Sequence, residues 1–311
     1  MKKSDVIIVV ALGVLLLLPF ASAGFFDWIT GKASTQPTNL SIPVGNTGPK
    51  IFAVTTASGS NTIIDTPNEQ SYTDVQIMVQ AYDHDNSTDL DDSTLTVDFT
   101  KALETTRSAA YGTGCSISSS ADKYRNYSCT IRMWYWDRAG TWNIAATIAD
   151  LSANSTSNTT QVFTYNTLLA FKINPNLLVW NTLQIGDTDK KAINNPTYLN
   201  NTGNNLANVT VNATDLAGII NPALYIDAND FKDSGIDECI GTSLNTGAFV
   251  PINTNDTSGI TLALTKGNLS ALAGQQTLYH CLTVVNETLI KQNYTTSTNG
   301  AWTIQIVQSP A

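Results

Sequence analysis

Alternation of apolar and polar residues across residues 126–150 constrains the fold more than any other feature of this sequence. Before a short polar interruption, the apolar set is Tyr127, Cys129, Ile131, Met133 and Tyr135. After it, the pattern returns at Trp142, Ile144, Ala146 and Ile148. A period of two places one set of side chains on one face of a β-strand. The stretch therefore predicts an antiparallel hairpin with one buried face and a tight turn at residues 137–140.

The apolar face of that hairpin requires a second sheet, because an isolated hairpin is only marginally stable in water. Other segments with strand-like patterns are separated by clusters of Ser, Asn, Asp and Gly, and none has a long helical period. They are residues 51–55, 75–81, 95–99 and 161–165, followed by residues 169–173, 178–185, 209–213, 278–284 and 301–307. A chain of 311 residues is long enough for about two domains. We therefore predict an all-β fold of two tandem β-sandwich domains, residues 49–167 and 168–311.

The N-terminus has the parts of a secretory signal. A positive start at residues 2–3 precedes an apolar run over residues 6–18, and Ala-Ser-Ala at residues 21–23 provides a cleavage site. The apolar run is short for a membrane span, and no second run of membrane length follows it. We therefore expect a cleaved signal peptide at residues 1–23 and a secreted mature chain without a membrane span. The alternative is an uncleaved N-terminal anchor over residues 6–23.

A linker is predicted to follow the signal peptide at residues 24–48. Most of it is rich in Thr, Ser, Pro and Gly, the composition of an extended tether. Within it, Leu40, Ile42 and Val44 alternate with polar or small residues. This short segment has the pattern of a strand that could add to the edge of a sheet.

The charge of the chain argues against two classes of partner. Only 13% of residues are charged, against roughly 25% in ordinary soluble domains, and the net charge is −9. A chain so poor in cations cannot build the basic surface that nucleic acid requires. Binding to an anionic membrane surface is disfavoured for the same reason.

The cysteines fit an exported protein. The four are Cys115, Cys129, Cys239 and Cys281. An even count in an exported chain indicates two disulfides, and of the three possible connectivities we expect neighbours to pair within each half. A zinc site is disfavoured because no Cys-x-x-Cys spacing occurs and His84 is remote from every cysteine in the sequence.

Twelve Asn-x-Ser/Thr sequences without proline at the middle position are candidate glycosylation sites. They are Asn39, Asn86, Asn126, Asn154, Asn158, Asn200, Asn208, Asn212, Asn255, Asn268, Asn286 and Asn293. A chain rich in Asn and Thr generates some of these by chance. Their spread over both halves nevertheless suits a glycosylated surface protein.

An acidic loop between two predicted strands is the candidate metal site. Its carboxylates are Asp83, Asp85, Asp89, Asp91 and Asp92. These groups repel one another, and a hard cation with oxygen ligands, such as calcium, would relieve that repulsion. The spacing is not that of an EF-hand, and the alternative is a solvated loop with a glycan at Asn86. A second acidic stretch at residues 227–238 is a weaker candidate because a lysine dilutes it.

Two tryptophans form a candidate ligand platform. If Tyr135 belongs to the core, Trp134 and Trp136 lie on the outer face of their strand beside Arg132. Outward tryptophans can stack against sugars. The alternative, which we favour, is that they pack under a neighbouring domain or face the interior, since large aromatics mostly serve cores and interfaces.

Three motifs resemble exported surface proteins of prokaryotes. GFFDWITGKAST at residues 24–35 is similar to the start of mature exported proteins of archaea. WDRAGTWNIAATIADLSAN at residues 136–154 resembles strands of immunoglobulin-like modules in prokaryotic surface proteins. YLNNTGNNLANVTVNA at residues 198–213 resembles the Asn-Thr-Gly-Asn strand-turn-strand of such modules. The resemblance implies that both sandwiches are immunoglobulin-like, and it is specific for fold rather than for ligand.

These observations together predict a non-catalytic, exported cell-surface protein with a structural or adhesive role, as a component of a surface layer, filament or cell envelope. The expected partners are other surface proteins or further copies of the chain, and calcium is the one cofactor considered. The alternative is a carbohydrate-binding or adhesin module, and a more remote one is a secreted hydrolase. No fingerprint of a catalytic motif or nucleotide-binding loop occurs in the sequence.

Overall fold

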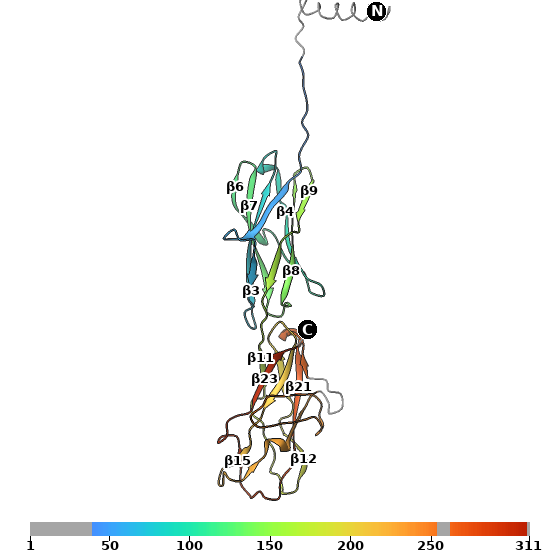
Figure 1. Ribbon diagram of the computed structural model, residues 1–311. Coiled ribbons are helices and arrows are strands. Elements are labelled where there is room, and N and C mark those ends of the chain that lie inside the picture. Colours follow the sequence, from blue (N-terminus) through green and yellow to red (C-terminus); the bar gives the residue numbers. More distant parts are fainter. Residues whose placement is uncertain (1–38, 254–261, 310–311) are drawn as a thin grey trace, which may run out of the picture. The chain divides into compact units, whose positions relative to one another are not determined.

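The computed structural model describes residues 39–253 and 262–309 (Figure 1). The predicted signal peptide, the linker up to residue 38 and Asn255 lie outside the described residues. Residues 46–311 form one compact unit, and the described residues before it have no regular secondary structure. The described residues are all-β, as predicted, and their helical structure is limited to three short 3-10 helices: η2 (Ser87–Asp89), η3 (Ala228–Asp230) and η4 (Leu269–Ala271). No helix in the described part of the chain has the length and apolarity needed to cross a bilayer.

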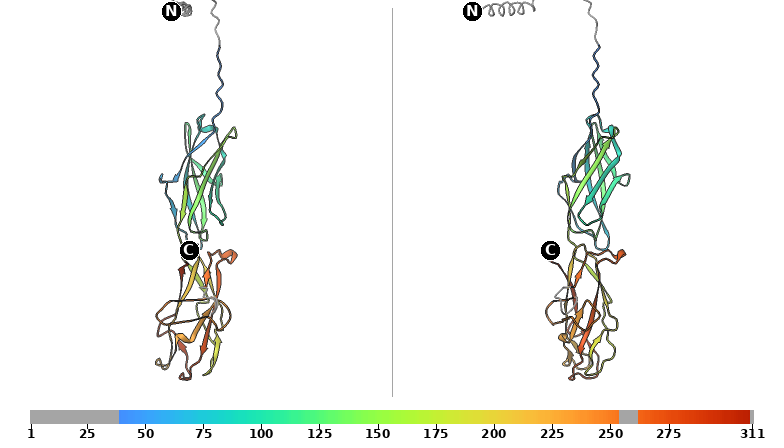
Figure 2. Two further views of the ribbon diagram at one scale, coloured as in Figure 1. Left: turned by 45° about the vertical axis from the view of Figure 1, so that its right-hand side comes forward. Right: turned by 90° about the vertical axis from the view of Figure 1, so that its right-hand side faces the viewer.

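The first half of the chain forms a ten-stranded sheet that curls around one core (Figure 2). Its strands are β1 (Lys50–Thr56), β2 (Ile63–Asp65), β3 (Tyr72–Tyr82), β4 (Leu90–Thr100), β5 (Arg107–Tyr111), β6 (Gly114–Ala121), β7 (Tyr124–Trp134), β8 (Gly140–Asp150), β9 (Ser155–Asn158) and β10 (Val162–Tyr165). Their order is β1-β3-β7-β6-β5-β4-β8-β10-β2, with β9 paired to β8. Most pairs are antiparallel, while β5–β6 and β10–β2 are parallel.

The alternation across residues 126–150 predicts the buried faces correctly but the strand pairing wrongly. Every residue of both apolar sets is buried, from Tyr127 on β7 to Ile148 on β8. Among the described strands, however, β7 pairs with β3 and β6, and β8 pairs with β4, β9 and β10, so the two are not a hairpin. Both strands instead reach one core from different parts of the curled sheet. A period of two specifies which face is buried and carries no information on the hydrogen-bonding partner.

The turn between β7 and β8 is held by a buried carboxylate. Asp137 Oδ2 accepts hydrogen bonds from Trp134 N at 2.7 Å and from Arg107 Nε at 2.9 Å, and its Oδ1 pairs with Arg107 Nη2 at 2.5 Å. Arg107 is the first residue of β5, so this ion pair attaches the connection between β7 and β8 to β5. The predicted tight turn of a hairpin is therefore a longer connection anchored to a third strand.

The second half contains shorter strands in three sheets around a second core. The strands are β11 (Phe171–Asn174), β12 (Thr188–Lys191), β13 (Thr197–Asn201), β14 (Ala207–Asn212), β15 (Leu216–Gly218), β16 (Tyr225–Ile226), β17 (Phe231–Ser234), β18 (Thr242–Ser243), β19 (Val250–Pro251), β20 (Ala263–Leu264), β21 (Gln275–Val284), β22 (Tyr294–Thr295) and β23 (Thr303–Gln308). The longest sheet path is β11-β13-β21-β17-β18, while β14 pairs with β19, β20 and β23, and β15 pairs with β16 and β22. The strand predicted at residues 178–185 is wrong, because this segment has no strand structure.

The Asn-Thr-Gly-Asn motif joins β13 to β14, but these strands pair with other neighbours rather than with each other. A side chain at Gly203 would place its Cβ 2.2 Å from the carbonyl oxygen of Leu168, so close backbone approach requires glycine there. The buried Asn204 side chain accepts a hydrogen bond from Leu168 N at 2.8 Å and donates one to Asn166 O at 2.9 Å. The motif therefore holds the segment that connects the two halves, through hydrogen bonds of Asn204. It does not form the turn of a hairpin between two paired strands.

Both disulfides connect neighbours along the chain, as predicted. Cys115 on β6 is bonded to Cys129, which lies directly opposite it on β7. Cys239 is bonded to Cys281 on β21. No free cysteine remains.

Candidate functional site

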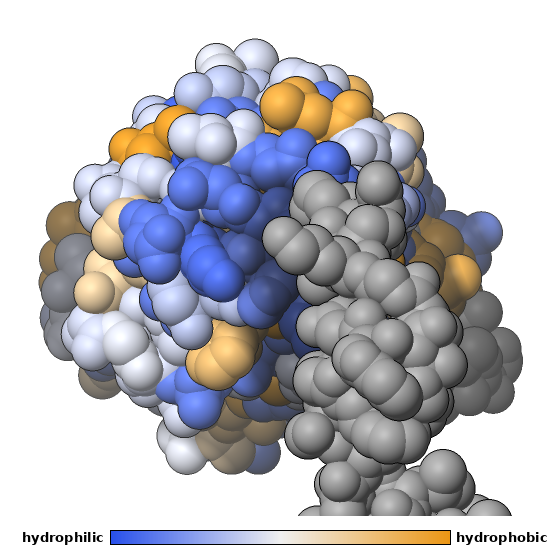
Figure 3. Space-filling view, turned by 90° about the horizontal axis from the view of Figure 1, so that it is seen from above, coloured by the Kyte–Doolittle hydropathy of each residue, from blue (hydrophilic) through white to orange (hydrophobic). Residues whose placement is uncertain are grey.

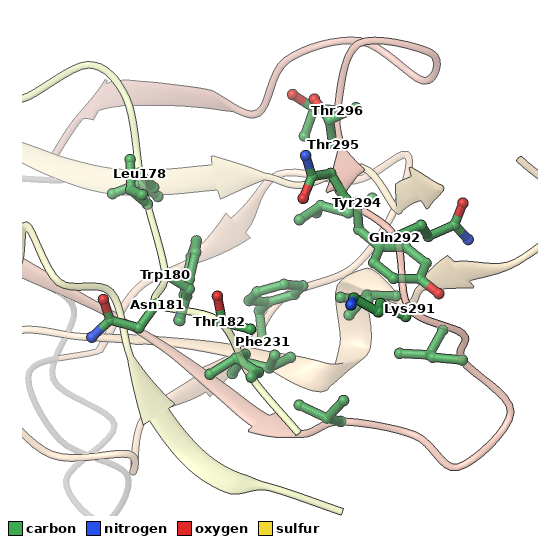
Figure 4. Close-up of a pocket in the computed structure, with 18 of the residues that line it drawn as sticks. Leu178, Trp180, Asn181, Thr182, Phe231, Lys291, Gln292, Tyr294, Thr295 and Thr296 are labelled. Atoms are coloured by element: carbon green, nitrogen blue, oxygen red, sulfur yellow. The ribbon is translucent and has the colours of Figure 1, made fainter. Parts of the chain in front are cut away.

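A pocket of about 830 Å³ in the second half is the principal candidate for a binding site (Figure 4). Its walls come mainly from two parts of the chain that are far apart in the sequence: the strand-free segment at residues 176–185, and residues 289–296 with Ala301 and Trp302. Further residues complete the lining, among them Phe231 on β17. A concave site of this size, lined by aromatic and aliphatic side chains with a few polar groups, has the usual form of a ligand pocket.

Aromatic rings fixed in position form the inner part of the pocket. Phe231 on β17 is buried, with Trp180 at 5.4 Å and Trp302 at 5.0 Å between ring centroids in edge-to-face contacts. The indole N–H of Trp180 donates to Lys190 O at 3.0 Å, and that of Trp302 donates to Thr214 O at 2.8 Å. Because both tryptophans are tethered, the pocket presents a rigid apolar surface.

Polar side chains surround this apolar surface, and they divide into two groups. Gln292 is structural, because its Oε1 accepts hydrogen bonds from Ile220 N and Asn221 N, each at 2.9 Å. By contrast, Asn181, Thr182 and Lys291 are exposed and make no side-chain hydrogen bond to another described residue. These three side chains are available to a ligand, and two of them are uncharged donors and acceptors.

The pocket suits an uncharged polar ligand. Among the described residues that line it, none is Asp, Glu, His or Cys, and Lys291 is the one charged side chain. Neutral amide and hydroxyl groups beside fixed aromatic rings are the chemistry that recognises a neutral sugar, whose hydroxyls hydrogen-bond and whose apolar face packs on a ring. The sequence offers no local signal for this pocket, because its aromatic residues lie on separate segments.

A buried chain of polar groups in the same half resembles a catalytic triad in its contacts but not in its access. His280 Nδ1 lies 2.8 Å from Asp233 Oδ1, and His280 Nε2 lies 3.0 Å from Thr197 Oγ1. All three residues are at most 1% exposed. A substrate cannot reach the Thr197 hydroxyl, so the arrangement satisfies polar groups inside the core. His280 therefore fills a polar gap in the core.

The two tryptophans of the predicted platform are turned to each other: Trp134 is the last residue of β7, and Trp136 lies in the turn that follows. Tyr135 is 2% exposed, and its hydroxyl accepts a hydrogen bond from Leu269 N at 3.1 Å. Trp134 and Trp136 are half-buried and stacked, with ring centroids 4.7 Å apart and planes 10° from parallel. Tyr72 packs edge-on against Trp134 at 5.6 Å. The tryptophans neither face the interior nor form one flat surface, since each ring covers a face of the other.

The acidic loop does not gather all five of its predicted ligands. Asp92 Oδ1 instead accepts hydrogen bonds from Arg125 and Tyr127, at 2.7 and 2.5 Å. Asp91 Oδ1 accepts from the backbone and the hydroxyl of Ser93. Asp85 Oδ2 accepts from the backbone N–H of Thr47 at 2.7 Å.

A smaller acidic cluster replaces the predicted one. Asp83 and Asp89 come together with Asp150, and one carboxylate oxygen from each residue lies within 4.8 Å of the other two. Asp150 is the last residue of β8, far along the chain from the loop, and sequence spacing gave no reason to include it. A second group of potential ligands, around Asp189, contains two cysteines that are joined in a disulfide and cannot ligate a metal as thiolates.

The weaker acidic stretch is divided among separate structural roles. Asp227 caps η3 through its bond to Asn229 N, Asp233 pairs with His280, and Asp237 pairs with Lys191 at 2.9 Å. These contacts leave no common centre for a cation among the described residues of this stretch.

The candidate glycosylation sites are accessible to different degrees. The exposed ones are Asn39, Asn154, Asn286 and Asn293; the partly buried ones are Asn86, Asn126, Asn158, Asn200, Asn208, Asn212 and Asn268. Asn293 also lines the pocket. A glycan there would lie beside the ligand position.

The sequence matches no protein-family model, and no curated protein matches it significantly.

Proposed function

We propose that this chain is a non-catalytic, exported cell-surface protein of adhesive or structural type, built from two tandem immunoglobulin-like sandwiches after a cleaved signal peptide. Three features support the proposal. The N-terminal residues have the pattern of a secretory signal. The chain has two disulfides, and disulfides form and persist in oxidising compartments outside the cytosol. Strands dominate the structure around two separate cores.

The pocket in the second half is the observation that supports an adhesive role. Its fixed aromatic rings and its free neutral groups, Asn181 and Thr182, favour a neutral glycan as the ligand. The lining lacks the paired carboxylates or histidine that hydrolysis of a glycosidic bond requires. A binding role therefore fits the described lining better than the hydrolase alternative.

Glycan binding tests this function directly. The mature chain is titrated with neutral oligomers of glucose, mannose and N-acetylglucosamine, and affinity is measured by isothermal calorimetry. We expect binding to at least one series, and a loss of about tenfold or more in the Asn181→Ala/Thr182→Ala double variant, since each lost hydrogen bond removes about 1 kcal/mol.

The matched control is the Trp134→Ala/Trp136→Ala variant, which removes the other aromatic site. It should bind as the unaltered chain does. Loss of binding in this control alone would move the site to the first half. Failure of the unaltered chain to bind any of the oligomers would contradict the adhesive function.

A structural role by self-assembly is the second candidate, and one observation favours it. Three alternating apolar residues before the compact unit are exposed: Leu40 by 83%, Ile42 by 74% and Val44 by 90%. None of these side chains is buried among the described residues. The outer edge of β11 has no strand partner among the described residues. We infer that residues 40–44 of one copy add as a strand to another copy, since an unpaired edge can accept one.

Light scattering of the mature chain across concentrations tests the assembly. Concentration-dependent oligomers are expected, and the Leu40→Asp/Ile42→Asp/Val44→Asp variant should remain a monomer. Oligomers that persist in this variant, or an unaltered chain that stays monomeric at every concentration, would contradict strand addition.

A further inference from the structure

Three segments converge at the end of the first half where β3 and β8 finish. Asp83 directly follows β3, Asp89 lies in η2 before β4, and Asp150 ends β8. Their nearest carboxylate oxygens lie within 4.8 Å of one another. The surface at this end is mostly hydrophilic where it is visible in Figure 3.

Two buried oxygens of this cluster lack partners. Asp83 is 0% exposed; its Oδ1 accepts a hydrogen bond from Asp85 N at 2.9 Å, whereas its Oδ2 has no partner among the described residues. Asp89 Oδ2 is also buried and without a partner among these residues. Burying a carboxylate oxygen without a hydrogen-bond donor or water costs free energy. A positive group bound at this position would offset that cost.

Asp150 brings a carboxylate that is fixed in position by hydrogen bonds. Its Oδ1 accepts hydrogen bonds from Ser152 N and Asn154 N, and its Oδ2 accepts from Asn46 Nδ2 and Asn154 Nδ2. These contacts hold the Asp150 carboxylate beside the carboxylates of Asp83 and Asp89, whose buried Oδ2 atoms lack partners among the described residues.

Asp89 lies beside the carboxylates of Asp83 and Asp150. Negative charges this close repel one another unless a positive group lies between them. A proton satisfies one oxygen, whereas a cation can satisfy the free oxygens of Asp83 and Asp89 together.

We propose that Asp83, Asp89 and Asp150 bind one calcium ion, which ties the end of β3, the start of β4 and the end of β8 to one another. Calcium prefers several oxygen ligands in flexible geometry and tolerates sites built from loops. Asn46 and Asn154 already contact Asp150, and rotation of either amide would turn a carbonyl oxygen toward the ion. The ion would also hold Asn46, the first residue of the compact unit, in its contact with Asp150.

Calcium binding is tested on the mature chain after removal of divalent ions with a chelator. Thermal unfolding is followed with added calcium or magnesium, and binding is measured by calorimetry. We expect one calcium per chain and a rise in Tm of about 5 °C at saturating calcium. Asp89→Asn should weaken calcium binding by about tenfold or more and remove most of the rise in Tm.

The control is Asp91→Asn, an acidic residue of the same loop that lies outside the cluster. It should keep the full calcium response. Unchanged calorimetry and Tm when calcium is added to the unaltered chain would overturn the proposal and leave a proton on Asp89 as the explanation. An Asp89→Asn chain that binds calcium as tightly as the unaltered chain would also overturn it. Because calorimetry on the unaltered chain needs no variant, a variant that misfolds does not remove the test.

Discussion

At the scale of single residues, one buried ion pair in the first half joins the β7–β8 connection to β5. The Arg107–Asp137 pair holds the connection between β7 and β8, and Asp137 is 1% exposed. We predict that Arg107→Ala lowers the free energy of unfolding by about 3 kcal/mol, because it leaves a buried carboxylate without its cation. Urea unfolding measures this change.

The exposed Arg132–Asp74 pair is the matched comparison for that prediction. Its side chains are 51% and 41% exposed. Asp74→Ala should cost less than about 1 kcal/mol. Equal costs for the two substitutions would show that the buried pair does not anchor the connection.

Two buried tyrosines predict a decline in stability at alkaline pH. Burial raises the pKa of Tyr127, with a further contribution from Asp92, and burial likewise raises the pKa of Tyr165. Above pH 10 the unfolded chain loses these protons while the folded chain keeps them, so stability falls as pH rises. Urea unfolding between pH 9 and 11 should show this slope, and Tyr165→Phe should reduce it. An identical slope in the variant would rule out Tyr165 as a source.

At the scale of elements, the two disulfides should differ in their contribution to stability. Cys115 and Cys129 are separated by 14 residues on strands that already pair, while Cys239 and Cys281 are separated by 42. In the chain-entropy model the shorter loop contributes about 3 kcal/mol and the longer about 4. Denaturant unfolding of the two double serine variants should therefore show the larger loss for Cys239→Ser/Cys281→Ser. The reverse order would contradict this argument.

The elements also show what the sequence could and could not predict. Alternation predicted the buried faces of β7 and β8 because burial is a local property of a strand. It missed their partners, because pairing depends on the path of the chain around the core. Proximity in sequence likewise found Asp83 and Asp89 but missed Asp150, which β8 delivers from elsewhere. The pocket was missed for the same reason, since Trp180, Phe231 and Trp302 meet only through the fold of the second half.

At the scale of the whole molecule, the two halves differ in structure, and we propose that they differ in role. The first half has long strands, a disulfide between neighbouring strands and the proposed calcium site, all of which favour rigidity. The second half has short strands and extended connections, and these connections form the pocket. Binding residues on loops held by a sheet scaffold are a common arrangement. We therefore assign support to the first half and recognition to the second.

Hydrogen–deuterium exchange on the mature chain, with and without a saturating neutral oligosaccharide, tests the assignment of recognition most directly. We expect slower exchange on binding in residues 176–185 and 289–296, the two segments that face each other across the pocket (Figure 4). Residues 132–136, around the stacked tryptophans, should be unaffected. Protection confined to residues 132–136, or no protection anywhere, would contradict the assignment of recognition to the second half.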